Sequence, residues 1–309
     1  MDVPSPFLRR SQALAAGFTD HELRTALGRG ELVALRRGVF VPREVHDATD
    51  EIEHHRLAAL AASDESEGVF SHVTAAVLHG LAVWDLPLKR LHVTVGGGSH
   101  GKATARRVVH AAPLDESDVV TITGVRVTSV ARTVVDLAHT VGFEQAVVTG
   151  DAALARISAH ELSDATERRT GRRGAPAARR ALAFLDGRSE SVGESRSRVL
   201  LHRAGFPPPE LQHRIHTVQG EFIGRVDFAW EEFGVVGEFD GFAKYGEGRD
   251  AFEALRREKH REDALRAAGW VVARWTWEHL DRPDAVAQRI RYAVAAASGR
   301  RTLPDSPSR

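Results

Sequence analysis

The sequence predicts a multidomain protein that combines α-helices with β-strands, an α/β chain of the α+β multidomain type. Three observations support this fold class. The chain has 309 residues, more than one small hydrophobic core organises, so two or three domains are expected. Its apolar positions change along the chain from helical spacing to strand alternation and back. Its composition, 42% hydrophobic and 27% charged, is ordinary for a globular protein.

Composition also excludes some classes of chemistry. The chain has no cysteine, which removes disulfides, thiolate catalysis and cysteine-ligated zinc. Its 42 Lys and Arg balance its 42 Asp and Glu, so a nucleic-acid surface needs local clustering of positive charge. The N-terminus does not look like a signal peptide, and no apolar run reaches the ~20 residues of a membrane span. We therefore expect a cytoplasmic protein with no membrane partner.

Residues 1–45 predict two helices followed by a basic hairpin. The expected elements are a helix at Leu8–Ala16, a helix at Asp20–Gly28 and two strands within Leu32–Val41. Thr19, with Glu22 three residues later, forms a capping box at the start of the second helix. This order is typical of a winged helix-turn-helix domain that binds DNA; the alternative is a small helical subdomain that packs on its neighbour. The candidate DNA-binding residues are Arg24, Arg29, Arg36 and Arg37.

Residues 46–186 predict a mixed α/β middle domain. The expected helices are Ile52–Ala62, His72–Leu81 and Ser129–His139, and the expected strands are Leu91–Val95, Val108–Ala111, Val119–Thr123 and Val125–Thr128. An arginine-rich stretch follows, with seven arginines and three acids between Asp164 and Arg188. It suits contact with a phosphate backbone or, as the alternative, a solvated helix face. The sixteen histidines, among them His72, show no spacing typical of a zinc site and are expected to be scattered.

Residues 187–309 show the clearest order of elements. The pattern predicts a helix, three strands, a helix, a strand and a final helix, at Ser191–Ala204, Arg214–Val218, Phe222–Trp230, Gly234–Asp240, Asp250–Ala268, Trp270–Thr276 and Asp284–Ala297. Three successive strands followed by a helical crossover imply a sheet that contains both antiparallel and parallel pairs.

Acidic residues on two of these strands are expected on one face of the sheet. The residues expected to face the core from the first of these strands are Val226, Phe228 and Trp230. Asp227 alternates with them, and Phe239 separates Glu238 from Asp240 on the next strand. Because alternate side chains share a face, these three carboxylates should converge on the side away from the core. Carboxylates this close persist mainly beside a divalent cation, for which oxygen ligands favour Mg²⁺ or Mn²⁺, or beside basic groups. The alternative is therefore an exposed salt-bridge lattice with Lys244, Arg256, Lys259 and Arg261.

A set of motifs in this block resembles a known nuclease superfamily. The motifs are Glu194–Arg198, Arg225–Ala229, Gly237–Gly241, Lys244-Tyr245, Glu258–Asp263 and Gly269–Trp275. In this order they are similar to the PD-(D/E)xK superfamily, and more closely to a branch related to very-short-patch mismatch-repair endonucleases. The resemblance implies a restriction-endonuclease-like αβββαβ core in which Asp227 and Glu238 hold a metal ion and Glu194 is a supporting acid.

The resemblance also implies a catalytic lysine two residues after Glu238, where this chain has Asp240. Lys244 or Lys259 would have to replace that lysine. The candidate catalytic residues are then Glu194, Asp227, Glu238, Asp240, Lys244 and Lys259, and the candidate ligands for Mg²⁺ or Mn²⁺ are Asp227, Glu238 and Asp240.

The N-terminal two thirds resemble a second family. The stretches concerned are Leu14–Val41, Ser71–Ala76, Leu78–Leu81 and Ala131–Ala138. They are similar to AbiEi-type antitoxins of type IV toxin–antitoxin systems. This resemblance implies a winged helix that binds DNA and, as a partner, a nucleotidyltransferase toxin.

Two functions follow from these resemblances. The first is a metal-dependent DNA endonuclease that the winged helix guides to its site. The second is a non-catalytic, antitoxin-like transcriptional regulator that uses the nuclease fold as a binding platform. Asp240 in the lysine position favours the regulator, whereas the presence of Asp227, Glu238, Lys244 and Lys259 together favours the endonuclease.

Overall fold

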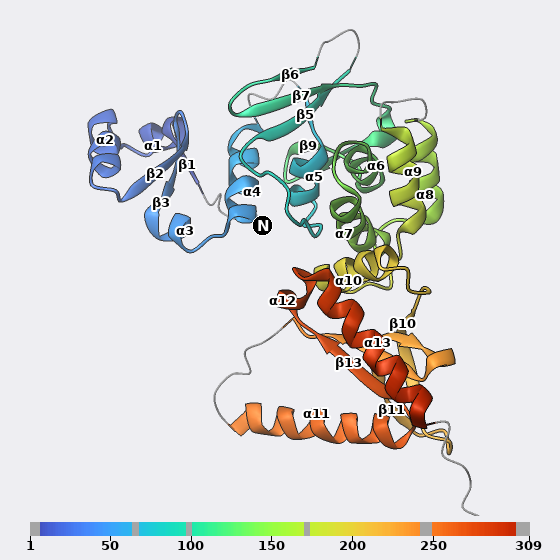
Figure 1. The fold of residues 1–309 in the computed structure, drawn as a ribbon. Coiled ribbons are helices and arrows are strands. Elements are labelled where there is room, and N and C mark those ends of the chain that lie inside the picture. The colour runs from blue at the N-terminus through green and yellow to red at the C-terminus, as the bar shows by residue number, and fades with distance from the viewer. Residues whose placement is uncertain (1–6, 64–67, 97–100, 170–173, 242–248, 301–309) are drawn as a thin grey trace, which may run out of the picture. The chain divides into compact units, whose positions relative to one another are not determined.

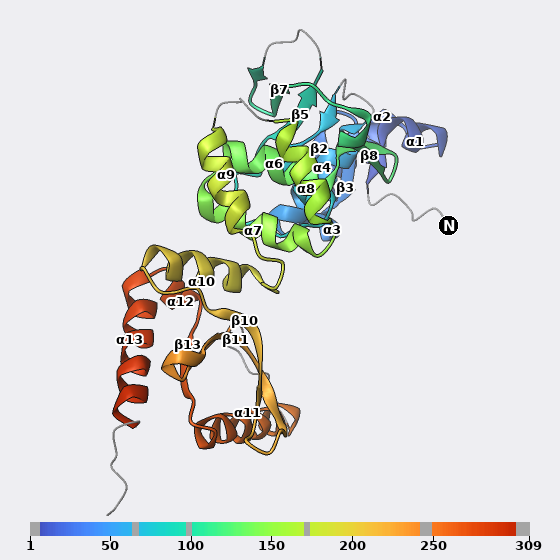
Figure 2. The same ribbon diagram turned by 90° about the vertical axis from the view of Figure 1, so that its right-hand side faces the viewer.

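The structure is a computed structural model that describes residues 7–63, 68–96, 101–169, 174–241 and 249–300. The chain divides into two compact units, Met1–Leu185 and Asp186–Arg309, whose elements are labelled in Figure 1 and Figure 2. The described residues form helices and three sheets, so the predicted α/β multidomain class is confirmed. Among the helices in these ranges, none is long and apolar enough to cross a membrane.

The N-terminal part of the first unit contains two helices and a β-hairpin. Its elements are β1 (Leu8–Arg9), α1 (Arg10–Ala15), α2 (Asp20–Gly28), β2 (Leu32–Arg36), β3 (Val39–Pro42) and α3 (Arg43–Asp47), with the strand order β1-β3-β2. The predicted capping box is present, since the Glu22 amide donates to Thr19 Oγ1 at 3.2 Å and the Thr19 amide donates to Glu22 Oε2 at 2.7 Å. Gly38 turns the hairpin with a φ of 72°, a left-handed conformation that glycine adopts without strain.

The rest of the first unit is built on a six-stranded sheet. Its strands are β4 (Val69–Phe70), β5 (Leu91–Val95), β6 (Lys102–Ala103), β7 (Arg107–Ala111), β8 (Val119–Ile122) and β9 (Val125–Thr128), in the order β6-β7-β5-β4-β9-β8. β5 pairs parallel with β7 and β4 pairs parallel with β9, and the other neighbours are antiparallel. The four predicted strands are present. The sequence did not reveal β4 and β6, because two residues are too few to show alternation.

Six helices and a short turn accompany this sheet in the described part of the unit. They are α4 (Glu51–Ala61), α5 (His72–Leu78), α6 (Val130–Thr140), α7 (Phe143–Leu154), α8 (Ala159–Glu167), α9 (Ala175–Phe184) and the 3-10 turn η2 (Glu116–Asp118). Every residue of α5 is buried. The arginine-rich stretch does not form one exposed face: Arg179 and Arg180 are exposed on α9, but Arg169 is buried. Arg172 and Arg173 lie outside the described residues.

The second unit has the predicted order of elements. They are α10 (Val192–Arg203), β10 (Glu210–His216), β11 (Phe222–Trp230), the 3-10 turn η3 (Glu231–Phe233), β12 (Val235–Phe239), α11 (Arg249–Ala267), β13 (Val271–Trp275), α12 (Trp277–Leu280) and α13 (Pro283–Arg300). The sheet order is β10-β11-β12-β13, and only the β12–β13 pair is parallel. The mixed sheet is therefore confirmed. The first strand begins earlier than predicted, at Glu210, and Val218, which is 97% exposed, follows its end.

Helices cover both faces of this sheet (Figure 2). On one face, Leu201 of α10 and residues of α13 pack against Phe228 and Trp275. On the other face, Leu265 of α11 packs in a cluster with Val236. The sheet is thus the middle of three layers, and its central strands are buried on both sides.

The strand β11 is irregular at Asp227, which changes the residues that face each side. Val226 packs in the cluster beneath α11, whereas Phe228 and Trp230 pack on the opposite face. The prediction that all three share one core face is therefore wrong for Val226. The physical cause is a break in the β10–β11 ladder, where Gln212 has a left-handed φ of 54° and neither Gln212 nor Asp227 is a paired residue. Asp227 occupies the break.

Candidate functional site

The predicted acidic residues meet in a cleft at the end of β12, beside the middle of β11. The cleft has a volume of about 370 Å³, and its lining residues are Arg225, Asp227, Glu238, Phe239, Asp240, Glu258, Arg261 and Arg274. They come from β11, β12, α11 and β13, with Asp240 directly after β12. The structure thus brings Asp227, Glu238 and Asp240 together, as expected, and adds three arginines that were not expected to take part as a group.

The Asp227 carboxylate accepts a hydrogen bond from the backbone of the neighbouring strand β12. Its Oδ2 accepts a hydrogen bond from the backbone amide of Phe239 at 2.7 Å. Burial, and then the negative charges of Glu194 and Glu238, raise the pKa of Asp227 to about 7 in spite of that hydrogen bond. Burial is the largest of these causes, and the positive charge of a bound cation would oppose it.

Glu238 is buried and is held by two arginines. Arg261 Nη2 donates to Glu238 Oε1 at 2.5 Å, and Arg274 Nε donates to Oε2 at 2.8 Å. The same two arginines also form ion pairs with Glu258, and Arg274 lies 3.3 Å from Glu262. Both oxygens of the Glu238 carboxylate therefore accept charge-assisted hydrogen bonds, which are about twice as strong as neutral ones.

Glu194 lies near this cleft but is also bound at the start of its own helix. Its carboxylate accepts hydrogen bonds from the Glu190 amide at 2.9 Å, from Ser191 Oγ at 2.8 Å and from Gln212 Nε2 at 2.7 Å. Glu194 therefore stabilises the first turn of α10. It acts on the cleft through its charge, which helps to raise the pKa of Asp227.

Arginines supply the positive charge that was expected from a lysine. Lys259 is exposed on α11 and is not one of the lining residues, and Lys244 lies outside the described residues. Arg261, two residues after Lys259, contacts Glu238 instead. Arg274 does so because it is the direct partner of Glu238 in the parallel pair β12–β13. Arg261 belonged to the salt-bridge alternative, but nothing in the sequence pattern singled out Arg274, since its position depends on a strand register.

The carboxylates of the cleft suit a metal ion in kind, but they do not surround one in this arrangement. Carboxylate oxygens are ligands that Mg²⁺ and Mn²⁺ prefer. The raised pKa of Asp227 is also compatible with a cation site, because a nearby positive charge favours the ionised carboxylate. Among the described residues, however, Asp227, Glu238 and Asp240 do not form a group whose oxygens all lie within 4.8 Å of one another. Each Glu238 oxygen already accepts a hydrogen bond from an arginine, so the two guanidinium groups compete with a cation for this carboxylate.

Two of the four predicted DNA-binding arginines line a second cleft. Arg24 of α2 and Arg37 of the hairpin turn are exposed and border a cleft of about 740 Å³ in the N-terminal part of the first unit. Arg36 instead donates from Nη1 to the Ala61 carbonyl at 3.3 Å. Arg29 lies directly after α2 and is exposed, and its Nη1 is 3.8 Å from Glu31 Oε1. Arg24 and Arg37 are therefore the better placed pair for a common ligand.

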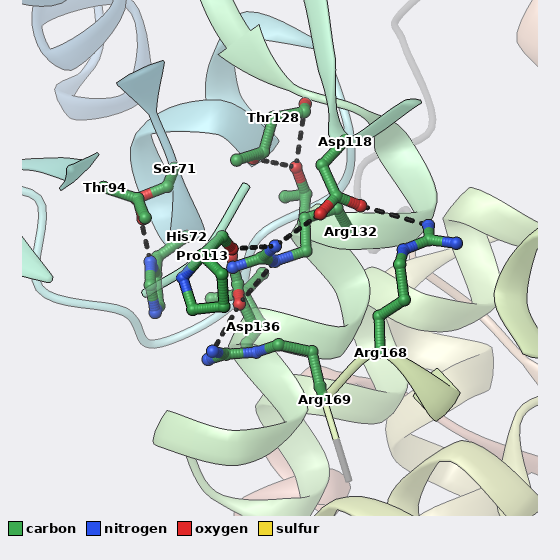
Figure 3. Close-up of polar contacts among 12 residues, drawn as sticks. Ser71, His72, Thr94, Pro113, Asp118, Thr128, Arg132, Asp136, Arg168 and Arg169 are labelled. Carbon is green, nitrogen blue, oxygen red and sulfur yellow. Dashed lines mark hydrogen bonds and ion pairs between the residues drawn. The ribbon is translucent and has the colours of Figure 1, made fainter. Parts of the chain in front are cut away.

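A separate group of charges lies in the interior of the first unit (Figure 3). Arg132 of α6 donates from Nη1 to Asp118 at 2.7 Å and from Nε to Asp136 at 3.0 Å. Arg168 and Arg169 add ion pairs of 3.1 Å each, to Asp118 and Asp136. Arg132, Asp118 and Asp136 are at most 1% exposed, and burial raises the pKa of Asp136. The arginine-rich stretch thus begins with two residues that bind the interior of the fold.

The chain is similar to two Mycobacterium tuberculosis proteins, uncharacterized protein Rv2248 and uncharacterized protein MT2308, which come from different strains. It is 32% identical to each over 282 residues, and the match covers 88% of this chain and 96% of each relative. It is also similar to the crystal structure of the RV2827C protein from M. tuberculosis, with a TM-score of 0.38 and 15% identity over 68% of this chain and 83% of that one. No protein-family model matches the chain.

Proposed function

The chain belongs to the same family as Rv2248 and MT2308 of M. tuberculosis, and we propose that it is a DNA-binding protein whose C-terminal unit hydrolyses phosphodiester bonds with Mg²⁺ or Mn²⁺. The observation that carries this proposal is the cleft in which Asp227, Glu238 and Asp240 meet Arg261 and Arg274. Carboxyl groups with perturbed pKa values that line a cleft are typical of functional sites.

The order of elements around the cleft supports a nuclease-like core. α10 carries the acid Glu194, β11 carries Asp227, β12 carries Glu238, and α11 leads to a parallel β13. This αβββαβ order is the one that the resemblance to PD-(D/E)xK nucleases and very-short-patch repair endonucleases implies. Asp240 departs from that pattern, and Arg261 and Arg274 offer positive charge in place of the lysine.

Asp227 and Asp240 are the residues that would first hold the cation. Glu238 would join them once its hydrogen bonds with Arg261 and Arg274 are broken. A bound divalent ion neutralises charge on the scissile phosphate and lowers the pKa of its bound water. Asp227 is suited to this role, because its pKa of about 7 falls when positive charge arrives and its ionised form becomes favourable.

The arginines around Glu238 are suited to an exchange of partners. A guanidinium group binds phosphate oxygens in the same forked geometry as carboxylate oxygens. The side chains of Arg261 and Arg274 are 26% and 33% exposed, so a DNA phosphate in the cleft can reach them. Their hydrogen bonds would then pass from Glu238 to the phosphate, and Glu238 would become available as a metal ligand.

Cleavage of supercoiled plasmid in the presence of Mg²⁺ or Mn²⁺ tests the hydrolase proposal. We expect the wild-type protein to cut the plasmid and Asp227→Asn to abolish cutting. Arg261→Ala should slow it at least tenfold, which corresponds to about 1.4 kcal/mol. Lys259→Ala, on the same helix but outside the cleft, should leave the rate unchanged, as should Asp263→Asn, which removes an exposed charge from α11. A wild-type protein that leaves every DNA substrate intact would disprove the proposal.

The N-terminal helices and hairpin are proposed to bind the DNA. The strand order β1-β3-β2, with α2 before the hairpin, supports the winged helix-turn-helix interpretation. We expect the double substitution Arg24→Ala and Arg37→Ala to weaken DNA binding and to lower the salt slope by about two, since each lost phosphate contact lowers it by about one. An unchanged slope would place the DNA-binding surface elsewhere in the chain.

One observation favours a second candidate function, a non-catalytic transcriptional regulator of the AbiEi antitoxin type. Both oxygens of Glu238 are already bound by arginines, and Asp240 occupies the position of the nuclease lysine. The C-terminal unit would then be a binding platform, and a nucleotidyltransferase toxin would be its partner. Binding of the protein to its own promoter, without affinity for Mg²⁺ or Mn²⁺ and without cleavage, would support this function over the first.

A further inference from the structure

Three histidines converge inside the first unit. His72 begins α5, His92 lies in β5 and His110 lies in β7. One ring nitrogen of each lies within 4.8 Å of the corresponding nitrogens of the other two. His72 is buried, and the other two are partly buried. The expectation that the histidines are scattered is therefore wrong for these three, because strand pairing and the position of α5 join residues that are far apart in the sequence.

The backbone register explains the arrangement of two of these side chains. In the parallel pair β5–β7, Thr94 lies opposite His110, so His92, two residues before Thr94, shares a face of the sheet with His110. His110 Nε2 lies 3.1 Å from His92 Nδ1. The His110 ring also stacks on the His72 ring, with centroids 3.6 Å apart and an angle of 16° between the planes.

His72 has a backbone conformation that few residues other than glycine adopt. Its φ is 53°, in the left-handed region, and residues held in such conformations cluster at functional sites. Its ring is fixed by the Ser71 hydroxyl, whose Oγ lies 2.9 Å from His72 Nδ1 and accepts a hydrogen bond from Thr94 Oγ1 at 2.8 Å. These three residues are labelled in Figure 3. Nδ1 is therefore engaged, which leaves Nε2 of His72 as the available ligand atom.

We propose that His72, His92 and His110 form a binding site for a transition-metal ion, with Zn²⁺ as the expected occupant. Imidazole nitrogens suit Zn²⁺, and three histidines leave a fourth position for water. At a Zn–N distance of about 2.0–2.1 Å, the ligand nitrogens of a tetrahedral site stand roughly 3.3 Å apart. The His92–His110 pair, at 3.1 Å, already has nearly this separation. The His72 ring, which stacks on that of His110, has to turn toward the ion, because a metal lies in the plane of each imidazole that binds it.

The surroundings of the three histidines are compatible with a dication. Burial lowers the pKa of His72 well below its usual value and the pKa of His92 and of His110 to about 4, and nearby positive charges act in the same direction. The neighbouring ion network opposes three arginines to three aspartates, so it has no formal net charge; its members are Arg132, Arg168, Arg169, Asp115, Asp118 and Asp136.

Binding of Zn²⁺ to the full chain tests the proposal. After removal of metals with a chelator, we expect the wild-type protein to bind one Zn²⁺ per chain, and Co²⁺ to replace it with visible absorption from a nitrogen-ligated site. His92→Ala and His110→Ala should each weaken Zn²⁺ binding by at least about 100-fold. His54→Ala is the matched control. The His54 ring stacks on that of His46 at 4.2 Å, but no third ligand joins this pair among the described residues, so zinc affinity should not change.

A second measurement decides the matter if a histidine variant fails to fold. X-ray absorption at the zinc edge of the loaded wild-type protein should show three imidazole nitrogens at about 2.0–2.1 Å. Three results would each overturn the proposal: no Zn²⁺ binding by the wild type, wild-type affinity in folded His92→Ala and His110→Ala variants, or a spectrum with fewer than three imidazole ligands.

Discussion

In the described part of the chain, the arginines paired with carboxylates around Asp136 and those around Glu238 form two groups that differ in their access to solvent. In the first unit, Arg132 and Asp136 are at most 1% exposed. In the second unit, the side chains of Arg261 and Arg274 are 26% and 33% exposed and line a cleft with Glu238. A buried ion pair is broken only at high cost, whereas an ion pair that borders a cleft can exchange its partner for one from solution. The same residue types therefore form a structural group in one unit and a candidate site in the other.

The largest effect on stability is expected in the buried group. Asp136→Ala removes the carboxylate that binds Arg132 and Arg169. The positive charges of Arg132 and Arg169 would then stay in the interior without the negative charge of Asp136. The free energy of unfolding should therefore fall by about 3–5 kcal/mol. Urea denaturation measures this change. The exposed Asp263→Ala should change it by no more than about 0.5 kcal/mol. A loss below about 1 kcal/mol for Asp136→Ala would mean that the buried group is not a structural element.

In the cleft, a substitution should change the free energy of unfolding in the opposite direction. Asp227→Asn is expected to stabilise the protein. The pKa of Asp227 is about 7 in the folded protein and has an ordinary value of 3.8. Below the ordinary value the carboxyl is protonated in both states and has no effect. The cost of ionising it in the folded protein grows between the two values and is complete above pH 7, at most about 4 kcal/mol.

Asparagine removes this cost and keeps an acceptor for the Phe239 amide. Urea denaturation should therefore show a gain of about 2–4 kcal/mol for Asp227→Asn at pH 8 and no gain near pH 3.5, provided that both proteins remain folded there. Asp263→Asn, the exposed control, should show no difference at either pH. Equal stability of the wild type and Asp227→Asn at pH 8 would show that the Asp227 site is not short of positive charge.

The smallest effect on the free energy of unfolding is expected when an arginine of the cleft is replaced. Arg274→Ala removes contacts to Glu238, Glu258 and Glu262, but Arg261 still binds Glu238 and Glu258. Its free energy of unfolding should stay within about 1 kcal/mol of the wild type. A loss as large as that of Asp136→Ala would make the cleft pairs structural and remove the contrast between the two groups.

Much of the fold follows from local patterns in the sequence. The capping box of Thr19 and Glu22, the strands of the middle domain and the order of elements in the second unit are readable from spacing, since each depends on residues close in sequence. The break at Asp227 is not readable, because it depends on the conformation of Gln212 on the neighbouring strand. The sequence therefore predicted the wrong face for Val226.

The site could be predicted only in part, for a related reason. Alternation predicted that Asp227, Glu238 and Asp240 meet in one cleft, although the regular strand that it assumed is broken at Asp227. The contacts of Arg274 with Glu238 depend on the parallel register of β12 and β13, and those of His92 with His110 depend on the register of β5 and β7. Neither register has a signature within a single strand. For this reason the sequence did not reveal the contacts of Arg274 with Glu238, and it missed the histidine group.

The exchange of Arg261 and Arg274 from Glu238 to a DNA phosphate is tested most directly by cation binding with and without DNA. Ca²⁺, which prefers the same oxygen ligands, can be titrated calorimetrically into the protein alone and into the protein saturated with a short duplex, with duplex alone as the blank. We expect Ca²⁺ to bind at least tenfold more tightly, about 1.4 kcal/mol, when DNA is present, and Asp227→Asn to lose this gain. The same Ca²⁺ affinity with and without DNA in the wild-type protein would contradict the exchange.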